Sequence, residues 1–380
     1  MISPEDFVTW LDDQGVTFYT GVPDSLLKEL GTHVMATLPR NRHVIAANEG
    51  ASVGIAIGHY LRTGNPAAVY LQNSGTGNTV NPLLSLADPD VYGIPMLLVI
   101  GWRGQPGVKD EPQHVKQGRV MTSMLDGMDV PWSVLPQESD EAAKVVADAV
   151  TVAVERSGPF VLLVEKGTFA PAASRVAGST SGPEVPTREA ALGAVAALLG
   201  DEVVIVSTTG MLSRELFELR SAAGVDRALD FLTVGGMGHA SSIALGVALE
   251  EPEREVWCLD GDGALLMHTG SLAVIADHAP ANFLHVVFNN GVHDSVGGQP
   301  TSVEVVDVPA LATAAGYRWA RSLTGLAGLD QAVEEMRRHG GPALLELVVR
   351  PGHRSDLGRP TRSPAESKAA FMKALAGPAA

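Results

Sequence analysis

Short apolar runs alternate with longer amphipathic segments along almost the entire chain. Such alternation predicts parallel α/β domains, in which buried strands are joined by helices. A fully apolar run such as Pro95–Gly101 is typical of a sheet that is covered on both faces. We predict strands in the first half at Val16–Thr20, Val44–Ala47, Ala67–Gln72, Pro95–Gly101 and Phe160–Glu165, and in the second half at Val203–Ser207, Phe231–Val234, Glu255–Leu259, Phe283–Phe288, Tyr317–Ala320 and Ala343–Val349.

The periodic pattern is interrupted between Thr168 and Pro186, where Pro, Gly and Ser become frequent. This composition is typical of a linker. The sequence therefore predicts two doubly wound parallel-sheet domains of similar topology and no central domain. They occupy residues 1–167 and 187–380, the second ending in a C-terminal tail, with 168–186 between them.

The two halves resemble each other at a nearly constant separation, which favours a duplicated fold over coincidence. The differences between the copies indicate that the two halves have different roles. The first half has an acid, Glu49, where the second half has a methionine. The matching features lie 186 to 189 residues apart: Gly21 with Gly210, the glycine-rich segment 50–58 with 238–246, Glu49 with Met237, and Gly75-Thr76-Gly77 with Gly261-Asp262-Gly263.

Charge and cysteine content narrow the classes of function. The formal net charge is −16, which argues against nucleic acid as a partner and means that an anionic substrate needs a locally positive pocket. The single cysteine, Cys258, excludes an internal disulfide and lies in a predicted buried strand, so we interpret it as a structural thiol. The acidic, amphipathic N-terminus is unlike a signal peptide, and no apolar run approaches ~20 residues. We expect a cytoplasmic protein that does not bind membranes.

The stretch from Leu259 to Asn290 carries the clearest candidate chemistry. It predicts a strand, the turn Gly261-Asp262-Gly263, a helix that opens at Ala264, and a second strand that ends at Asn289-Asn290. Because the carboxyl ends of parallel strands face one crevice, we expect Asp262 and Asn290 to lie side by side. A carboxylate and an amide oxygen suit Mg²⁺, which completes its coordination with phosphates and water. The start of the helix favours the same anion.

The turn and the asparagine pair together resemble the GDG…NN signature of thiamine-diphosphate enzymes. A carboxylate before a small-residue helix, Glu49, is the second part of that pattern. Within the superfamily the chain resembles the phosphonopyruvate decarboxylase family. The strings that carry this resemblance are GVPDSLLKEL (21–30), ANEGASVGIAIGHYL (47–61), QNSGTGNTVNPLLSL (72–86), WRGQPGVKDEPQHVKQG (102–118), STTGMLSREL (207–216), GGMGHASSIALG (235–246), NNGVHDSVGGQPT (289–301) and DLGRPT (356–361).

The resemblance implies a pyrimidine-binding first domain, in which Glu49 hydrogen-bonds N1′ of the aminopyrimidine ring. The alternative for Glu49 is a surface acid at the end of a strand. Met237 resembles the apolar wedge that bends the cofactor, with the Gly235 carbonyl accepting from the 4′-amino group, although a methionine that fills a core gap is equally consistent.

For the second domain the resemblance implies that Asp262, Asn290 and the main-chain carbonyl of Val292 bind Mg²⁺. The diphosphate is then held by further residues around the same strand ends. His239 in this set has an alternative as a core histidine at a helix start. The candidates are Thr208, Thr209, Gly210, His239, Gly263 and Ala264.

The implied reaction is decarboxylation of 3-phosphonopyruvate, a small 2-oxoacid, to 2-phosphonoacetaldehyde in phosphonate natural-product biosynthesis. Asp24 and His114 are candidates for proton transfer, although an N-cap role explains Asp24 equally well. Lys109, Arg354 and Arg359 are candidates for the phosphonate, since arginine suits bidentate contact with such anions. The alternative for the two arginines is a solvated charged segment.

The family places each active site between two subunits, so we expect a homodimer at least. The main rival is a sulfopyruvate decarboxylase, whose domains resemble separate chains, so the fused layout favours the phosphonate enzyme. A non-catalytic cofactor-binding scaffold is disfavoured because Glu49, Asp262 and Asn290 occur together. An NAD-binding fold is also disfavoured, because no predicted strand leads into G-x-G-x-x-G with an acid ~20 residues further on.

Overall fold

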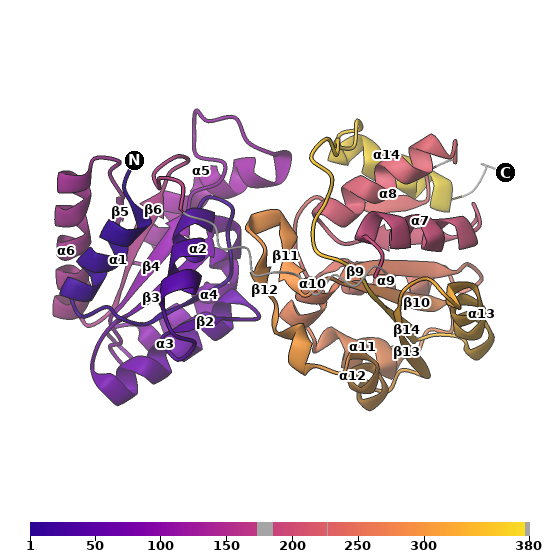
Figure 1. Ribbon diagram of the computed structural model, residues 1–380, viewed down its shortest axis with the longest axis horizontal. Helices are drawn as coiled ribbons and strands as arrows, with labels where there is room; N and C mark the ends of the chain where they lie inside the picture. Colours follow the sequence, from indigo (N-terminus) through magenta and orange to yellow (C-terminus); the bar gives the residue numbers. More distant parts are fainter. Residues whose placement is uncertain (173–184, 226, 377–380) are drawn as a thin grey trace. The chain divides into compact units, whose positions relative to one another are not determined.

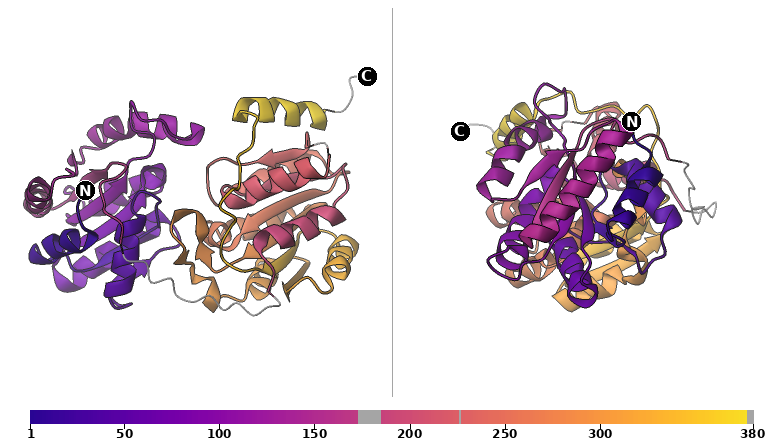
Figure 2. Two further views of the ribbon diagram at one scale, coloured as in Figure 1. Left: turned by 45° about the horizontal axis from the view of Figure 1, so that its top comes forward. Right: turned by 90° about the vertical axis from the view of Figure 1, so that its left-hand side faces the viewer.

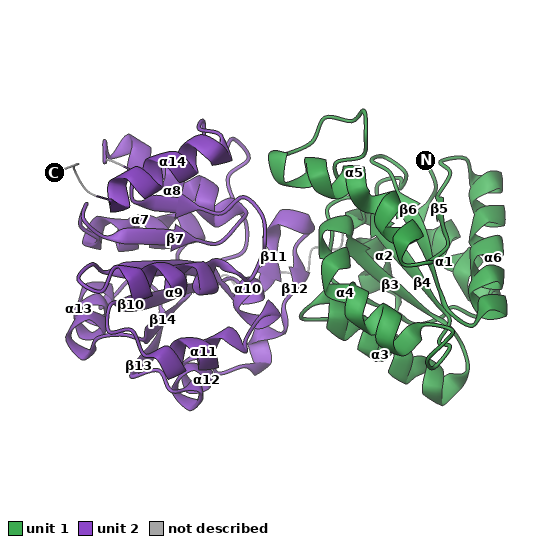
Figure 3. Ribbon diagram, turned by 180° about the vertical axis from the view of Figure 1, so that it is seen from behind, with its two compact units in different colours: residues 1–177 green, residues 178–380 purple. Residues whose placement is uncertain are grey.

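A computed structural model describes residues 1–172, 185–225 and 227–376 of this protein. These residues form two compact units, residues 1–177 and 178–380 (Figure 3). Most of the predicted linker, at 173–184, lies outside the described residues. Its first residues are packed, because Thr168 and Phe169 are buried and the Phe169 ring meets the Phe7 ring edge-on at 5.2 Å. The packed part of the first unit therefore extends past residue 167.

The first unit contains a six-stranded parallel sheet in the order β2-β1-β3-β4-β6-β5, with helices on both faces (Figure 1). Its elements are α1 (Pro4–Asp13), β1 (Tyr19–Gly21), α2 (Lys28–Thr37), β2 (His43–Ile45), α3 (Glu49–Thr63), β3 (Ala67–Gln72), η1 (Asn73–Gly75), α4 (Thr76–Pro82), η2 (Leu83–Ala87), β4 (Met96–Gly101), α5 (Pro112–Gly127), β5 (Trp132–Val134), α6 (Ser139–Arg156) and β6 (Pro159–Val164).

The second unit contains a six-stranded parallel sheet in the order β13-β14-β10-β9-β7-β8 and a small antiparallel pair, β11-β12. Its elements are α7 (Arg188–Leu198), β7 (Val204–Ser207), α8 (Met211–Ala222), β8 (Asp230–Leu232), α9 (Ala240–Glu250), β9 (Val256–Gly261), α10 (Asp262–Met267), α11 (Ser271–His278), β10 (Phe283–Asn289), β11 (Val292–His293), η3 (Asp294–Val296), β12 (Gln299–Pro300), η4 (Ser302–Val305), α12 (Val308–Ala315), β13 (Trp319–Thr324), α13 (Leu329–His339), β14 (Ala343–Val348) and α14 (Pro364–Leu375).

The two sheets have the same topology, which confirms the predicted pair of similar doubly wound domains. If the strands of the second sheet are numbered in chain order within their own unit, both orders read 2-1-3-4-6-5. The position of Glu49, after the second strand, is therefore matched by Met237, and the turn after β3 is matched by the turn after β9. In each sheet the order in which strands are added reverses between the first and third strands. In folds of this class, ligands bind at the carboxyl ends of the strands at this switch point.

Alternation along the buried strands supplies a separate apolar core on each face of each sheet. In β3 and β4, Tyr70 and Val99 pack beneath α1, α2 and α6, whereas Leu71 and Leu98 pack beneath the helices of the opposite face. The second unit is layered in the same way. Both faces of each strand are thus covered, as the apolar runs predict.

Several boundaries and elements differ from the sequence prediction. The first strand begins at Tyr19 rather than Val16, because the Val16 N–H donates to the Leu11 carbonyl at the end of α1 at 2.9 Å instead of pairing in the sheet. The short β11 and β12 were not predicted, since two residues each are too few to show a period. The predicted C-terminal tail contains α14 (Figure 2), which Ser363 and Glu366 cap. The centroid of the Phe371 ring in this helix lies 5.4 Å from that of Phe231.

None of the helices in the described part of the chain combines the length and apolarity that crossing a membrane requires.

Candidate active site

Glu49 is the first residue of α3 and its side chain is buried, with 6% of its surface exposed. The Asn78 amide, from α4, donates a 2.7 Å hydrogen bond to Glu49 Oε2. Burial raises the pKa of this carboxyl, and the bond from Asn78 opposes the rise only in part. A buried carboxyl held in this way is not the surface acid that the sequence left as an alternative.

The turn after β3 makes room for this carboxyl. A methyl group on Gly75 would lie 2.2 Å from Glu49 Oε1, whereas one on Gly77 would meet nothing within 4 Å. The backbone at Gly75 has φ −82°, which any residue can adopt, so its requirement for glycine is steric rather than conformational. Gly75 therefore leaves one Glu49 oxygen close to the backbone of the turn.

Asp24 lies in the turn between β1 and α2 and is 1% exposed. Its Oδ2 accepts backbone N–H bonds from Leu26 at 2.8 Å and Leu27 at 3.2 Å, and its Oδ1 accepts from Gln72 Nε2 at 2.6 Å. Burial raises its pKa despite these bonds. Both oxygens are thus occupied, one within the turn and one by β3. Asp24 is nevertheless not the N-cap expected as its alternative role, because α2 begins at Lys28 with Leu27 as its N-cap, and its bonds to Leu26 and Leu27 shape the turn before the helix.

Arg103 follows β4 and is held by the loop that it begins. Its Nε and one terminal nitrogen donate to the two oxygens of Asp110 at 2.8 and 2.5 Å, and its other terminal nitrogen donates to Ser25 Oγ at 2.8 Å. Burial favours the neutral form of Asp110, yet the Arg103 bonds and two backbone amides hold its pKa well below its usual range. Lys109, in the same loop, is exposed.

His114 lies near the start of α5 and is 9% exposed. Its Nδ1 is buried and has no hydrogen-bond partner among the residues that the structure describes. Burial lowers its pKa, and the charge on Arg103 lowers it further. The imidazole is therefore neutral at pH 7, with one nitrogen that still needs a partner.

In the second unit the structure brings Asp262 and Asn290 together although residues 263–289 separate them. The backbone N–H of Asn290 donates to the Asp262 carboxylate, and Thr301 Oγ1 donates to Asp262 Oδ2 at 2.5 Å. Burial raises the pKa of Asp262 to about 6. The Asn290 amide is held on both sides, since Oδ1 accepts from the Val292 N–H at 3.1 Å and Nδ2 donates to Asp294 Oδ2 at 2.9 Å.

Asp294 joins this loop to the helix layer. Besides Asn290, it accepts from Arg188 at 2.8 Å and from the Gly352 N–H at 3.0 Å. Arg188 in turn forms a bidentate pair with Glu215 at 2.8 and 2.9 Å, and both side chains are almost fully buried. The loop after β10 is therefore anchored by a buried ionic network.

Thr208, Thr209 and Gly210 connect β7 to α8 at the reversal point of the second sheet. Thr208 Oγ1 is buried and finds no hydrogen-bond partner in the described part of the chain, although the Thr208 N–H donates to the Leu259 carbonyl at 2.8 Å. Gly210 has φ +100°, which favours glycine. A buried hydroxyl without a partner at this edge fits a polar ligand such as a phosphate oxygen.

Met237 and His293 both lie against Gly263. A methyl group on Gly263 would be 3.3 Å from Met237 Cε and 3.0 Å from His293 Cε1. Burial lowers the pKa of His293 to about 4, so its imidazole is neutral. Gly235 lies two residues before Met237 in the same loop, and Ala264, next to Gly263, is buried.

His239 is exposed, and its Nδ1 lies 3.1 Å from the Met237 carbonyl oxygen. Its ring meets the His268 ring at a centroid distance of 4.5 Å. The buried core histidine that the sequence left as an alternative is therefore wrong, because the ring lies at the surface of the loop.

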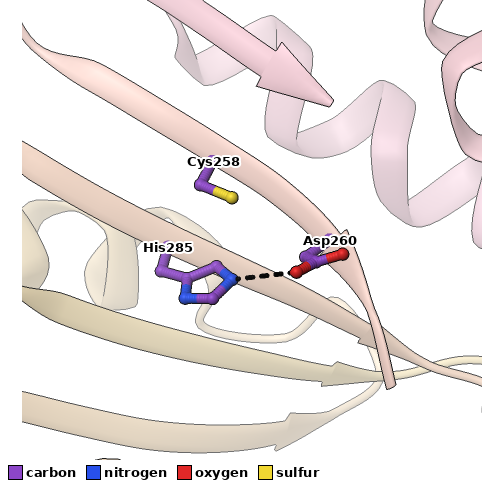
Figure 4. Close-up of side chains that lie close together, drawn as sticks. All are labelled: Cys258, Asp260 and His285. Atoms are coloured by element: carbon purple, nitrogen blue, oxygen red, sulfur yellow. Dashed lines mark ion pairs between the residues drawn. The ribbon is translucent and has the colours of Figure 1, made fainter. Parts of the chain in front are cut away.

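Beneath the Asp262 turn, three buried polar side chains face one another across β9 and β10 (Figure 4). His285 Nε2 and Asp260 Oδ2 are 3.6 Å apart, and the Cys258 thiol lies on the same face. Burial and the neighbouring Asp260 raise the pKa of Cys258 well above its usual range. The thiol is therefore protonated, which agrees with the structural role expected for Cys258.

Arg354 is surrounded by acids rather than presented to a ligand. It pairs with Glu189 at 2.9 Å, with Asp356 at 3.3 Å and with Glu218. It lines a pocket of about 480 Å³ whose other walls include Glu189 and Glu215. These contacts support the charged-segment alternative for Arg354, whereas Arg359 is exposed.

Several site residues were missed by the sequence reasoning. Asn78 and Gly75 belong to a turn that was recognised, but only the fold shows that they contact Glu49. Thr301 and Asp294 support the Asp262 loop through contacts that no local pattern encodes. Arg103 could have been found, because it lies two residues after the buried strand β4, and the corresponding loop of the other half, after β10, contains Asn290.

Comparison with known proteins identifies the family. Residues 4–129 match the thiamine pyrophosphate enzyme N-terminal TPP binding domain, and residues 208–347 match the thiamine pyrophosphate enzyme C-terminal TPP binding domain. The chain is 40% identical to a phosphonopyruvate decarboxylase of Streptomyces viridochromogenes, over 100% of this chain and 96% of the relative. It is 39% identical to a phosphonopyruvate decarboxylase of Streptomyces hygroscopicus, over 98% and 94% of the two chains.

A sulfopyruvate decarboxylase of Methanosarcina acetivorans is 28% identical over 92% of this chain and 96% of the relative. Because that protein aligns with both units in one polypeptide, the fused layout does not favour a phosphonate over a sulfonate enzyme, and this part of the sequence argument was wrong. The higher identity to the two Streptomyces proteins is the better discriminator. The chain is a member of the phosphonopyruvate decarboxylase family of thiamine pyrophosphate enzymes.

Proposed function

We propose that this protein converts 3-phosphonopyruvate and a proton into 2-phosphonoacetaldehyde and CO₂, using thiamine diphosphate and Mg²⁺. One observation carries the proposal: 40% identity over the complete chain to a relative of that name, against 28% for the sulfopyruvate relative. We further propose a role in the biosynthesis of phosphonate natural products, which include antibiotics. The cytoplasmic location expected from the sequence stays a prediction.

Thiamine diphosphate, when bound, supplies the electron sink that cleavage next to a ketone requires. The Glu49 carboxyl fits the ring nitrogen of the aminopyrimidine. Its raised pKa lets it hold a proton at a pH where an ordinary glutamate is ionised, so it can donate as well as accept. Asn78 fixes Oε2, and Gly75 keeps the space beside Oε1 open to the turn backbone.

The loops after β9 and β10 fit a magnesium ion with its diphosphate. Asp262 offers a carboxylate, Asn290 Oδ1 has a second lone pair, and Val292 contributes a main-chain carbonyl. Thr208 Oγ1 is the partnerless hydroxyl available to the diphosphate. Thr209, Gly210, Gly263, Ala264 and His239 remain proposed contacts around it.

The remaining proposed residues act near the substrate or the rings of the cofactor. Met237 fits the apolar support, because its methyl group faces Gly263, and the Gly235 carbonyl is the proposed acceptor for the 4′-amino group. Neutral His114, with its partnerless Nδ1, is a better candidate for proton transfer than Asp24, whose oxygens are already bonded. Lys109 and Arg359 stay candidates for the phosphonate, with less support for Arg354.

Purified protein tests the reaction directly. We expect aldehyde release from phosphonopyruvate only when thiamine diphosphate and Mg²⁺ are both present. Sulfopyruvate assayed in parallel should give a lower kcat/KM. Turnover of sulfopyruvate with a higher kcat/KM would favour the rival function, and activity after chelation and removal of both cofactors would contradict the cofactor assignment.

We also propose that the protein is at least a homodimer, with Glu49 of one subunit and Asp262 of another completing each site. Mixing inactive Glu49→Gln and Asp262→Asn proteins tests this. Random exchange should restore about one quarter of wild-type activity, since half of the dimers are mixed and each has one intact site of two. If both residues act within one chain, mixing restores nothing. Sedimentation gives the oligomer size independently.

A further inference from the structure

Arg103 is a cation of the first unit that several side-chain hydrogen bonds hold in place. Its guanidinium carries five N–H groups, and three of them are used by Asp110 and Ser25. Two N–H groups therefore have no protein partner in the described structure. The side chain is 20% exposed, so it is not sealed within the core.

Asp110 binds both the backbone of the loop and the guanidinium of Arg103. Its carboxylate accepts not only from Arg103 but also from the backbone N–H groups of Gly104 at 2.8 Å and Glu111 at 2.7 Å. The carboxylate thus accepts from four donors, two on Arg103 and two on the loop backbone. Its negative charge is therefore shared with the loop and only partly neutralises the charge of the guanidinium. The Arg103 pKa is raised, foremost by its hydrogen bonds to Asp110, and the side chain stays charged.

Two close backbone contacts make the loop rigid. A methyl group on Gly104 would lie 1.9 Å from the His114 carbonyl oxygen, and one on Gly118 would lie 1.9 Å from the Gly104 carbonyl oxygen. Trp102 Nε1 also donates to the Gly118 carbonyl at 2.9 Å. Arg103 is therefore preorganised, and little side-chain entropy remains to be lost when it binds a ligand.

The turn that follows β3 contacts both Arg103 and Glu49, the acid proposed to bind the cofactor. Asn73 forms a double hydrogen bond with the Arg103 backbone, donating to its carbonyl at 2.8 Å and accepting from its N–H at 3.0 Å. Gly75, two residues further on, contacts Glu49. Arg103 follows the fourth strand of its sheet, as Asn290 does in the second unit. The guanidinium thus lies at the edge of the sheet that faces the ligands.

We propose that Arg103 binds the anionic tail of the substrate, the phosphonate of 3-phosphonopyruvate, through its free N–H groups; this inference rests on the proposed function. The tail is the appropriate target because the carboxylate must leave as CO₂. A strong ion pair to that carboxylate stabilises the ground state and slows its loss, whereas the phosphonate keeps its charge throughout. A fixed, forked donor also suits three tetrahedrally arranged oxygens.

Comparing substrates with different tails tests the inference. Arg103→Gln and Arg103→Lys are assayed with phosphonopyruvate, with sulfopyruvate and with 2-oxobutanoate, whose tail is uncharged. For Arg103→Gln we expect kcat/KM for phosphonopyruvate to fall ~10- to 100-fold, mainly through KM, because hydrogen bonds to a charged group are lost. The value for 2-oxobutanoate should stay within about threefold, since its tail makes no such bond.

Two further variants make the comparison specific. Lys116→Gln removes one positive charge from an exposed position on α5 and should leave the kcat/KM of all three substrates unchanged. Lys109→Gln tests the rival cation of the same loop. If Lys109→Gln shows the tail-dependent loss and Arg103→Gln does not, the inference is overturned. An equal loss on all three substrates overturns it too, because Arg103 is then only structural.

The experiment also separates this inference from the proposed function. If the wild-type protein prefers sulfopyruvate, the proposed substrate is wrong, but a selective loss on sulfopyruvate in Arg103→Gln still supports tail binding. If Arg103→Gln does not fold, Arg103→Lys decides, since it keeps the charge beside Asp110 and loses the fork. Undiminished phosphonopyruvate KM in a folded Arg103→Lys protein contradicts bidentate binding.

Discussion

At the scale of single residues, function depends on what surrounds each acid rather than on the acid itself. Glu49, Asp24 and Asp262 are all buried carboxyl groups with raised pKa values. They differ in their partners. Asp24 has one oxygen bonded within its own turn and the other bonded by Gln72, whereas Glu49 receives one side-chain bond and Asp262 receives a side-chain bond from Thr301. Only the last two are suited to hold a ligand.

The space beside Glu49 gives a prediction at this scale. Gly75→Ala should displace the carboxylate, because the added methyl group would lie 2.2 Å from Oε1. We expect kcat to fall by ~10²-fold or more, the usual contribution of a positioned acid or base. Steady-state kinetics with saturating thiamine diphosphate measures this.

Gly77→Ala is the matched control. It is in the same segment, in helix α4, and its methyl group would meet nothing. Its activity should be unchanged and its stability equal or slightly higher, since alanine favours a helix over glycine. Equal activity losses in both variants would falsify the steric argument.

The pKa of Asp262 predicts how stability depends on pH. In the cofactor-free protein its folded value, about 6, is above the ordinary value of 3.8. The folded state therefore holds this proton more tightly, so its contribution is complete below pH ~4 and is lost as the pH rises through 6. Relative to Asp262→Asn, the wild type should lose up to about 3 kcal/mol between pH 4 and 7.

Urea unfolding of both proteins at several pH values measures this difference. Saturating thiamine diphosphate and Mg²⁺ should abolish it in the wild type, because a cation beside the carboxylate favours ionisation. A constant difference across the pH range would show that Asp262 ionises normally.

At the scale of elements, the strands position chemistry by ending together. The loops after β9 and β10 meet because these strands are parallel neighbours in register, with Phe288 opposite Gly261. The hairpin β11-β12 then returns Thr301 to the Asp262 carboxylate. Asp260 and His285, on the same two strands, lie beneath this arrangement and are buried.

The buried pair predicts a large effect on stability. His285→Leu removes the imidazole that lies 3.6 Å from the Asp260 carboxyl in the core, so we expect a loss of ~1–3 kcal/mol in the free energy of unfolding. The double variant Asp260→Leu/His285→Leu should be less destabilised than the sum of the single variants. Chemical denaturation measures this coupling, and additive effects would indicate that the two groups do not interact.

At the scale of the whole molecule, each unit has its own sheet and its own cores on both faces. Autonomous cores are the property that lets domains fold alone. We predict that residues 1–172 and 185–380, expressed separately, each give a cooperative thermal transition and near-native circular dichroism. A unit that unfolds without cooperativity would show that its core needs the other half of the chain.

Much of this architecture was predictable because it follows from local, repeated patterns. Runs such as Ala67–Gln72 agree with the observed strand, since a buried strand shows itself in consecutive apolar residues. The duplication was visible because glycine turns recur at a constant spacing. Short or solvent-facing elements such as β11 and α14 were not predicted, because packing rather than periodicity stabilises them.

The sequence by itself determined the two α/β units and the meeting of Asp262 with Asn290, because parallel strands bring their carboxyl ends to one edge whatever their side chains. Only the tertiary structure decided what each polar group touches. It showed that Gly75 makes room for Glu49, that both Asp24 oxygens are already bonded, and that Arg103 is held by Asp110 with two N–H groups left over. Such contacts depend on side-chain direction and depth of burial, which spacing along the chain does not encode.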